Sequence, residues 1–146
     1  MSVAPPVKSG GSGLAFVGAR EIPRGNARPM STVLVIDDTV DCLEPLARLL
    51  RKDGHTVQCA ANGREGLARL IRFQPDVIVL DMMMPVMDGV TFLEAMRCNA
   101  AWRDLRVIVF TGCGDALPAA RLAELCVGEV FLKASTDFQR LLRVLS

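Results

Sequence analysis

The chain has 146 residues, which is enough for one domain with one hydrophobic core. Hydrophobic residues make up 51% of it and the formal net charge is +1. The sequence shows no basic patch, no apolar run of membrane-spanning length and no secretory signal, which argues against nucleic-acid binding, membrane insertion and secretion. We therefore expect a cytoplasmic protein that does not bind DNA directly. The five cysteines form no C-x-x-C pair, so neither a disulfide framework nor a zinc site is expected.

The first 30 residues differ in composition from the rest of the chain. The stretch from Met1 to Gly13 is rich in Pro, Gly and Ser, and residues 20–29 show no apolar periodicity. Such a segment cannot bury enough apolar surface to offset the entropy cost of ordering it. We therefore expect residues 1–30 to form a disordered arm, and Met30 is a candidate for the natural start.

From residue 31 to residue 146, segments typical of strands alternate with segments typical of helices. Apolar, β-branched runs predict buried strands at residues 33–36, 77–80 and 107–110. Shorter runs predict strands at residues 57–59 and 130–132. Five strands that alternate with five helices predict an α/β fold with a parallel sheet and right-handed crossovers.

Apolar stripes at helical spacing mark four of the five predicted helices. Asn62 and Glu65 have the spacing of a helix-capping pair, and Pro118 suits the first turn of the fourth helix. Pro45 should bend the first helix or delay its start. The side chains expected to face the core are Val40, Leu43, Ala47 and Leu50, then Leu67, Leu70 and Ile71, then Phe92, Ala95, Met96 and Asn99, and finally Phe138, Leu141, Leu142 and Leu145.

Polar residues follow four of the five predicted strands. They are Asp37 and Asp38 after the first strand, Asp81 after the third, Thr111 after the fourth and Lys133 after the fifth. The carboxyl ends of parallel strands share one rim of the sheet, where ligands bind, so we expect these side chains to lie together. Three packed carboxylates raise the pKa of at least one of them unless a cation is present. Oxygen ligands of this kind suit Mg²⁺, which favours one or two carboxylates together with substrate phosphate.

This combination of residues indicates phosphoryl-transfer chemistry. A lysine and a hydroxyl opposite the carboxylates can contact phosphate oxygens, and an aspartate there can act as a nucleophile that forms an aspartyl-phosphate. Each residue alone is a weak signal, because an aspartate or threonine after a strand more often caps a helix or a turn. Their joint occurrence at four strand ends is much harder to explain in that way.

On these residues, the sequence from Thr32 to Ser146 resembles the receiver domains of response regulators. The run from Asp81 through Met-Met-Met-Pro-Val-Met-Asp to Gly89 is a specific signature of that family. The resemblance implies a flavodoxin-like, doubly wound five-stranded parallel sheet with five helices. It also implies that Asp81 is the phosphoacceptor, Thr111 the switch hydroxyl and Lys133 the phosphate contact.

The resemblance further implies a metal and partners. Mg²⁺ would be bound by the carboxylates of Asp37, Asp38 and Asp81 and by the backbone carbonyl of Met83. Phosphate would come from a sensor histidine kinase or a histidine phosphotransfer protein of a two-component system or phosphorelay. The phosphorylated chain would signal to an unknown downstream protein by direct contact. Such a protein is not an enzyme, although it promotes its own phosphorylation and dephosphorylation. The chain stops where the fifth helix should end, which favours a stand-alone receiver of the chemotaxis type.

One departure from the family pattern concerns the switch. Val130 stands three positions before Lys133, where the family often has an aromatic residue, and Phe131 should point to the opposite side of the strand. Valine has few rotamers and little reach. We therefore expect the loop after Thr111 to rearrange on phosphorylation without an aromatic rotation.

Other interpretations stay open. The chain could be a receiver module from a hybrid kinase or a longer regulator, or a phosphate relay or sink. A pseudo-receiver that no longer takes phosphate is disfavoured by the intact acids, threonine and lysine. A phosphatase that also forms an aspartyl-phosphate would typically need a second aspartate two residues after Asp81, where this chain has Met83.

Overall fold

The computed structural model describes residues 31–112, 118–135 and 138–145. In this part of the chain, strands and helices alternate, and five strands form one sheet in the order β2-β1-β3-β4-β5. All four neighbouring pairs are parallel. The strands are β1 (Thr32–Ile36), β2 (Thr56–Ala60), β3 (Val77–Leu80), β4 (Arg106–Thr111) and β5 (Glu129–Leu132). The predicted flavodoxin-like α/β fold is confirmed.

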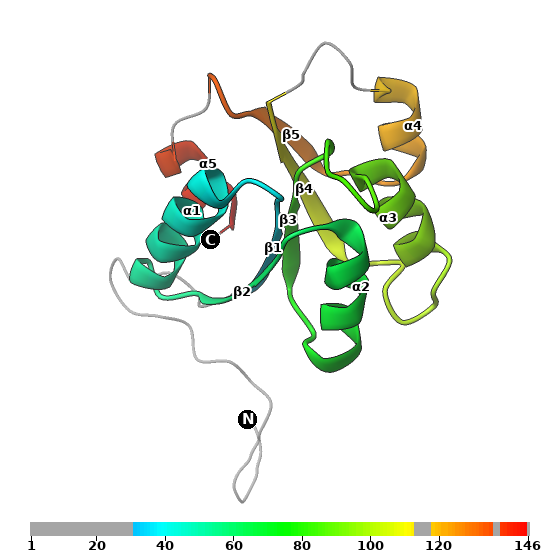
Figure 1. The fold of residues 1–146 in the computed structure, drawn as a ribbon, viewed down its shortest axis with the longest axis horizontal. Helices are drawn as coiled ribbons and strands as arrows, with labels where there is room; N and C mark the ends of the chain where they lie inside the picture. The colour runs from blue at the N-terminus through cyan, green and yellow to red at the C-terminus, as the bar shows by residue number, and fades with distance from the viewer. Residues whose placement is uncertain (1–30, 113–117, 136–137, 146) are drawn as a thin grey trace, which may run out of the picture.

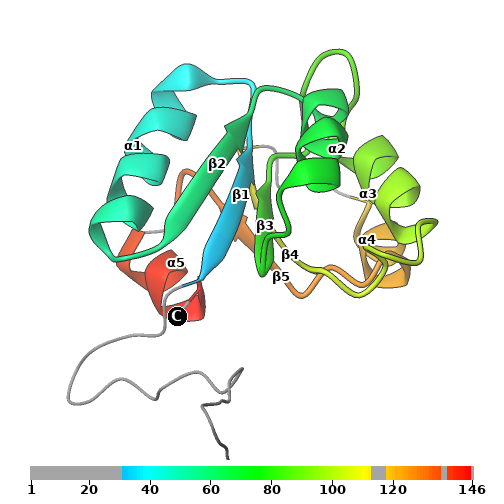
Figure 2. The ribbon, with the colours of Figure 1, turned by 90° about the horizontal axis from the view of Figure 1, so that it is seen from below.

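Helices cover both faces of the sheet. They are α1 (Val40–Lys52), α2 (Gly63–Arg72), α3 (Gly89–Arg97), α4 (Ala119–Glu124) and α5 (Phe138–Leu145). Figure 1 and Figure 2 show α1 and α5 on one face and α2, α3 and α4 on the other. None of these helices has the length and apolarity that crossing a bilayer requires. The predicted arm, residues 1–30, lies outside the described residues.

The alternation of side chains along the central strands builds two cores. In β1, Val33 and Val35 pack with α1 and α5, whereas Leu34 and Ile36 pack with the helices of the other face. All four residues of β3 are buried as well, which is why its sequence is an unbroken apolar run. Each such side chain contributes about 1.5–3 kcal/mol when it is fully buried. The ends of β1 and β3 are thus fixed by packing from both sides.

Five of the helix positions predicted to be buried are wrong. Val40 is 64% exposed, Ile71 is 74% exposed and Phe138 is 37% exposed, while Ala95 is exposed and Asn99 lies beyond the end of α3. Val40 opens α1 at the rim of the sheet, so no strand lies beneath it, and Leu46 is buried further along the helix. Successive helical residues differ by about 100° in direction, so Leu70 faces the sheet while Ile71 faces solvent.

In the described part of the chain, side-chain hydrogen bonds cap the starts of α2 and α3. The Asn62 side chain accepts a hydrogen bond from the Glu65 backbone N–H at 2.8 Å, and the Glu65 carboxylate accepts one from the Ala61 N–H at 2.7 Å, which confirms the predicted capping pair. Pro118 lies at the N-cap of α4, one position before the helix rather than in its first turn. Pro45 lies inside α1 and does not delay its start at Val40.

Candidate functional site

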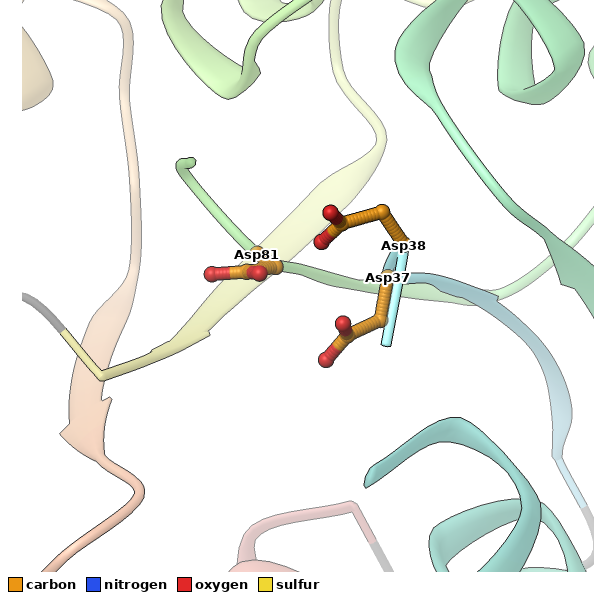
Figure 3. Close-up of side chains that lie close together, drawn as sticks. All are labelled: Asp37, Asp38 and Asp81. Carbon is orange, nitrogen blue, oxygen red and sulfur yellow. The ribbon is translucent and has the colours of Figure 1, made fainter. Parts of the chain in front are cut away.

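The three predicted acids come together where β1 and β3 end. The two strands pair in register, with Ile36 opposite Leu80, so the residues that follow them are neighbours. The Asp81 N–H donates to the Ile36 carbonyl at 2.9 Å, which continues the ladder one step past the strands. Carboxylate oxygens of Asp37, Asp38 and Asp81 lie within 4.8 Å of one another (Figure 3).

The acids differ in how much water reaches them. Asp37 and Asp81 are only 4% and 6% exposed, whereas Asp38 is exposed. The cluster is therefore buried on the sheet side and open to solvent beside Asp38. An opening of this kind gives a small ion or a phosphoryl group access to the buried carboxylates.

Lys133, which follows the edge strand β5, brings a positive charge to the cluster. Its backbone N–H donates to the Thr111 carbonyl at 2.8 Å. Its Nζ lies 2.6 Å from Asp37 Oδ2 and 3.5 Å from Asp81 Oδ2. Thr111 itself is fully buried at the end of β4. The structure thus places all five predicted strand-end residues on one rim.

Burial and neighbouring charges shift the pKa values of Asp37 and Lys133 in this cluster. Burial raises the pKa of Asp37, and the nearby charge of Asp81 adds to this, although hydrogen bonds from Lys133 and the Thr39 N–H act in the opposite direction. Burial alone would lower the pKa of Lys133, but the hydrogen bond to Asp37 and the charges of Asp37 and Asp81 together raise it. Both groups therefore bind their protons more tightly than they would in water.

A divalent cation fits this arrangement. Three carboxylates face one lysine ammonium, so two negative charges are in excess at the rim. Hard oxygen donors of this number and charge match the preferences of Mg²⁺. Asp37, Asp38 and Asp81 are the candidate side-chain ligands, while Met83, whose backbone carbonyl was the fourth predicted ligand, lies two residues after Asp81 on the β3–α3 loop.

The β3–α3 loop is closely packed beneath the site. The Gly89 N–H donates to the Met82 carbonyl at 3.0 Å, and a Cβ at Gly89 would lie 2.8 Å from Met82 Cα and 2.9 Å from the Asp81 carbonyl oxygen. Only glycine fits there, which explains its place in the signature run. Asp88 is not a fourth acid of the cluster, because its side chain caps α3 by accepting from the Thr91 N–H at 2.9 Å.

The same loop contains a feature that was not predicted from the residue pattern. Val86 has a φ of 70°, a conformation that β-branched residues rarely adopt. Its side chain is 74% exposed, and that of Met83 is 63% exposed. Nothing in an apolar residue after proline predicts a left-handed backbone, so this feature is visible only in the structure.

Comparison with known proteins bears on both the fold and the site. The family model for the response regulator receiver domain matches residues 33–145. Protein-glutamate methylesterase/protein-glutamine glutaminase 1 of Syntrophomonas wolfei is 33% identical over 120 residues, which cover 81% of this chain and 33% of that protein. The chain spans only 22–39% of the length of the curated relatives that it matches.

Solved structures agree with this match. Chemotaxis protein CheY4 of Vibrio cholerae superposes with a TM-score of 0.73 at 27% identity, covering 80% of this chain and 97% of that one. Response regulator TrrA of Thermotoga maritima, in complex with Mg²⁺ and BeF, superposes with a TM-score of 0.70 at 25% identity, covering 80% and 96%.

Replacing Asp37 with asparagine should stabilise the metal-free protein at neutral pH. The pKa of Asp37 in the folded state lies above its ordinary value of 3.8, so the protonated form stabilises the fold and that contribution is lost as the pH rises through the folded-state pKa. Asparagine keeps an acceptor for Lys133 without the charge. In urea denaturation with a chelator present, we expect Asp37→Asn to raise the midpoint at pH 7 and to lose this gain as the pH falls towards 3.8.

The exposed Asp104 supplies the control for this measurement. Asp104→Asn should leave the midpoint nearly unchanged at each pH. A gain for Asp37→Asn that grows as the pH falls would contradict the argument from burial and like charge.

Proposed function

The chain belongs to the response regulator receiver family, and we propose that Asp81 is its phosphoacceptor in a Mg²⁺-dependent reaction. The observation that carries this proposal is the convergence of Asp37, Asp38 and Asp81 within 4.8 Å, with the Lys133 ammonium 3.5 Å from Asp81. A carboxylate cluster with an adjacent cation is suited to binding a phosphoryl group and neutralising its charge.

The contacts of the acids favour Asp81 as the nucleophile. Asp37 is occupied on both oxygens, since Oδ1 accepts from the Thr39 N–H at 2.9 Å and Oδ2 accepts from Lys133 at 2.6 Å. Lys133 is 3.5 Å from Asp81 Oδ2, beyond hydrogen-bonding distance for a strong contact. Asp81 therefore keeps a carboxylate oxygen that can attack phosphorus, while Asp37 positions Lys133.

The reaction balances as a simple phosphoryl transfer. A lone pair of an Asp81 oxygen forms the new P–O bond as the bond between phosphorus and the leaving group breaks. The leaving group, an imidazole nitrogen or an acyl oxygen, departs with the electron pair. Bound Mg²⁺ would neutralise charge on the phosphoryl oxygens. Lys133, already held at the rim by Asp37, can shift its ammonium to the phosphate that forms on Asp81.

We expect the phosphate donor to be a sensor histidine kinase or a histidine phosphotransfer protein, acting in the cytoplasm. The phosphorylated chain would then signal by contact with a downstream protein. Thr111 is the residue best placed to couple the two events, because it is buried at the end of β4 and its carbonyl is bonded to Lys133. A second function, as a phosphate relay or sink, is favoured by Val130, which is half-exposed on β5 and offers no aromatic ring to move.

Asp81→Asn should fold normally and lose the phosphoryl label. The wild-type chain, incubated with acetyl phosphate and Mg²⁺, should gain one hydroxylamine-sensitive phosphoryl group by mass spectrometry, and a chelator should prevent the gain. Asp88→Asn is the matched control, because asparagine also caps helices and Asp88 lies outside the cluster. Full labelling of Asp81→Asn, or equal labelling without a divalent cation, would refute the assignment.

Thr111→Val should separate phosphorylation from the response to it. Valine fills the same buried volume without the hydroxyl, so we expect labelling within about threefold of wild type. In wild type, amide hydrogen exchange of residues 106–112 and 118–135 should change on phosphorylation, and in Thr111→Val most of that change should disappear. An unchanged exchange pattern in wild type would favour the relay or sink, and a full response in Thr111→Val would remove the switch role.

A further inference from the structure

Strand β2 forms one edge of the sheet and lies between α1 and α2 (Figure 2). In a parallel ladder, the backbone groups of alternate residues point towards the neighbouring strand, and those of the residues between them point away. The Ala60 carbonyl accepts from the Asp37 N–H and therefore points towards β1. Val57 and Cys59 consequently turn their backbone N–H and C=O groups to the free edge.

Two arginines from opposite faces of the sheet bind the carbonyls at this edge. Arg51 of α1 donates from Nη2 to the Val57 carbonyl at 3.1 Å, and Arg69 of α2 donates from Nε to the Cys59 carbonyl at 3.2 Å. The N–H groups of Val57 and Cys59 have no acceptor among the described residues. The free edge of β2 therefore presents hydrogen-bond donors, namely two N–H groups and two guanidinium groups.

An edge that offers only donors is unsuited to an added strand, because each such strand brings N–H groups that need acceptors. Carboxylates accept without donating, and their hydrogen bonds to charged donors are roughly twice as strong as neutral ones. The two bound carbonyls are two residues apart, about 6.6 Å along the strand, which is also the interval between alternate side chains of an extended segment. The edge thus matches carboxylates at alternate positions of an extended chain.

A groove of about 560 Å³ adjoins this edge on the α2 face of the sheet. It lies between Gln58 of β2 and the outer side of α2, and Ile71 and Phe73 contribute apolar side chains to its lining. Ile71 is 74% exposed. Arg69 and Arg72 line the same groove. The groove therefore combines an accessible apolar surface with two positive charges.

The positive charge of the groove is not balanced within the described residues. Glu65 is the one acid among the described lining residues, and its carboxylate is engaged by the Ala61 N–H at 2.7 Å. Arg72 has no hydrogen bond or ion pair in the described part of the chain. The helix dipole favours a basic residue in the last turn of α2, but it does not account for the exposed Ile71 between two arginines.

We propose that the free edge of β2 and the adjoining groove, together called the β2–α2 groove, bind an extended acidic segment of another protein. Carboxylates of this segment pair with Arg51, Arg69 and Arg72, and an apolar side chain beside them covers Ile71. None of these residues belongs to the acid cluster, so the inference does not depend on phosphorylation of Asp81.

A fluorescein-labelled peptide of alternating glutamate and leucine serves as the probe for the full chain, with fluorescence anisotropy as the measurement. We expect saturable binding that weakens as KCl is added. Arg72→Glu should weaken the binding about fivefold, in the upper range for one exposed ion pair, and Ile71→Ser should weaken it by a similar factor. Arg103→Glu, the same charge reversal at an exposed arginine outside the groove, should match wild type.

Amide hydrogen exchange locates the bound peptide. Exchange of the Val57 and Cys59 N–H groups, which face the free edge, should slow when the peptide is present. Exchange of the Gln58 N–H, which faces β1, should stay as it is in the free chain. Protection of Gln58 alone, or of none of the three, would place the peptide elsewhere and overturn the inference.

The inference is also overturned if the wild-type chain shows no saturable binding, if a lysine-leucine peptide binds equally well, or if Arg72→Glu binds as tightly as wild type. Undiminished affinity for a glutamate-serine peptide would remove the apolar groove from the site. Dimers of the free chain that protect the Val57 and Cys59 N–H groups would make a second copy the occupant, and tighter binding of single-stranded DNA of equal charge would make it a nucleic acid. Either result would overturn the proposal.

Discussion

The repulsion between carboxylates at the ends of β1 and β3 is the constraint on which this molecule depends. Parallel pairing of the two strands places Asp37 and Asp81 side by side, and burial from both faces of the sheet prevents them from moving apart. A fold does not gain stability from such a cluster, because removing carboxylates from water is costly. The raised pKa of Asp37 reflects this cost, whereas the raised pKa of Lys133 reflects the attraction of its ammonium to Asp37 and Asp81, which offsets part of it.

The surrounding structure is arranged to hold the cluster in spite of its repulsion. Lys133 crosses from the end of β5 to bind Asp37, and its own backbone is fixed to β4 through Thr111. The loop after Asp81 is held by Gly89, where no side chain would fit. In the same loop Val86 carries backbone strain. The unfavourable contributions to the stability of the fold are thus concentrated at the rim, while the strands and the faces of the sheet consist of well-packed apolar side chains. Residues that raise the energy of the free protein in this way are expected where binding partners later lower it.

The sequence predicts the parts of this structure that depend on local pattern. Buried parallel strands need continuous apolar runs, so β1, β3 and β4 could be predicted from the sequence. The parallel topology then predicts that the polar residues after these strands lie on one rim of the sheet. It was harder to predict whether side chains near the boundary of the core are buried or exposed. The helical period places Val40 on the inner face of α1, but the sheet ends before it. Leu70 and Ile71 were both predicted to face the core, and only Leu70 is buried. The positive φ of Val86 could not be predicted, because the loop that contains it is held by a hydrogen bond from the Gly63 N–H of α2, which is distant in sequence.

The central claim is that the excess charge of the cluster is balanced by a divalent cation, and the free energy of unfolding measured against Mg²⁺ concentration tests it most directly. A ligand that binds only the folded state adds RT ln(1 + [L]/Kd), about 2.7 kcal/mol at a hundred times Kd. In wild type the free energy should rise with Mg²⁺ in this way at pH 7, while KCl of equal ionic strength should have little effect. In Asp38→Asn, which removes the solvent-facing carboxylate, most of the Mg²⁺ response should be lost. An equal response to both salts, or an undiminished Mg²⁺ response in Asp38→Asn, would contradict the account.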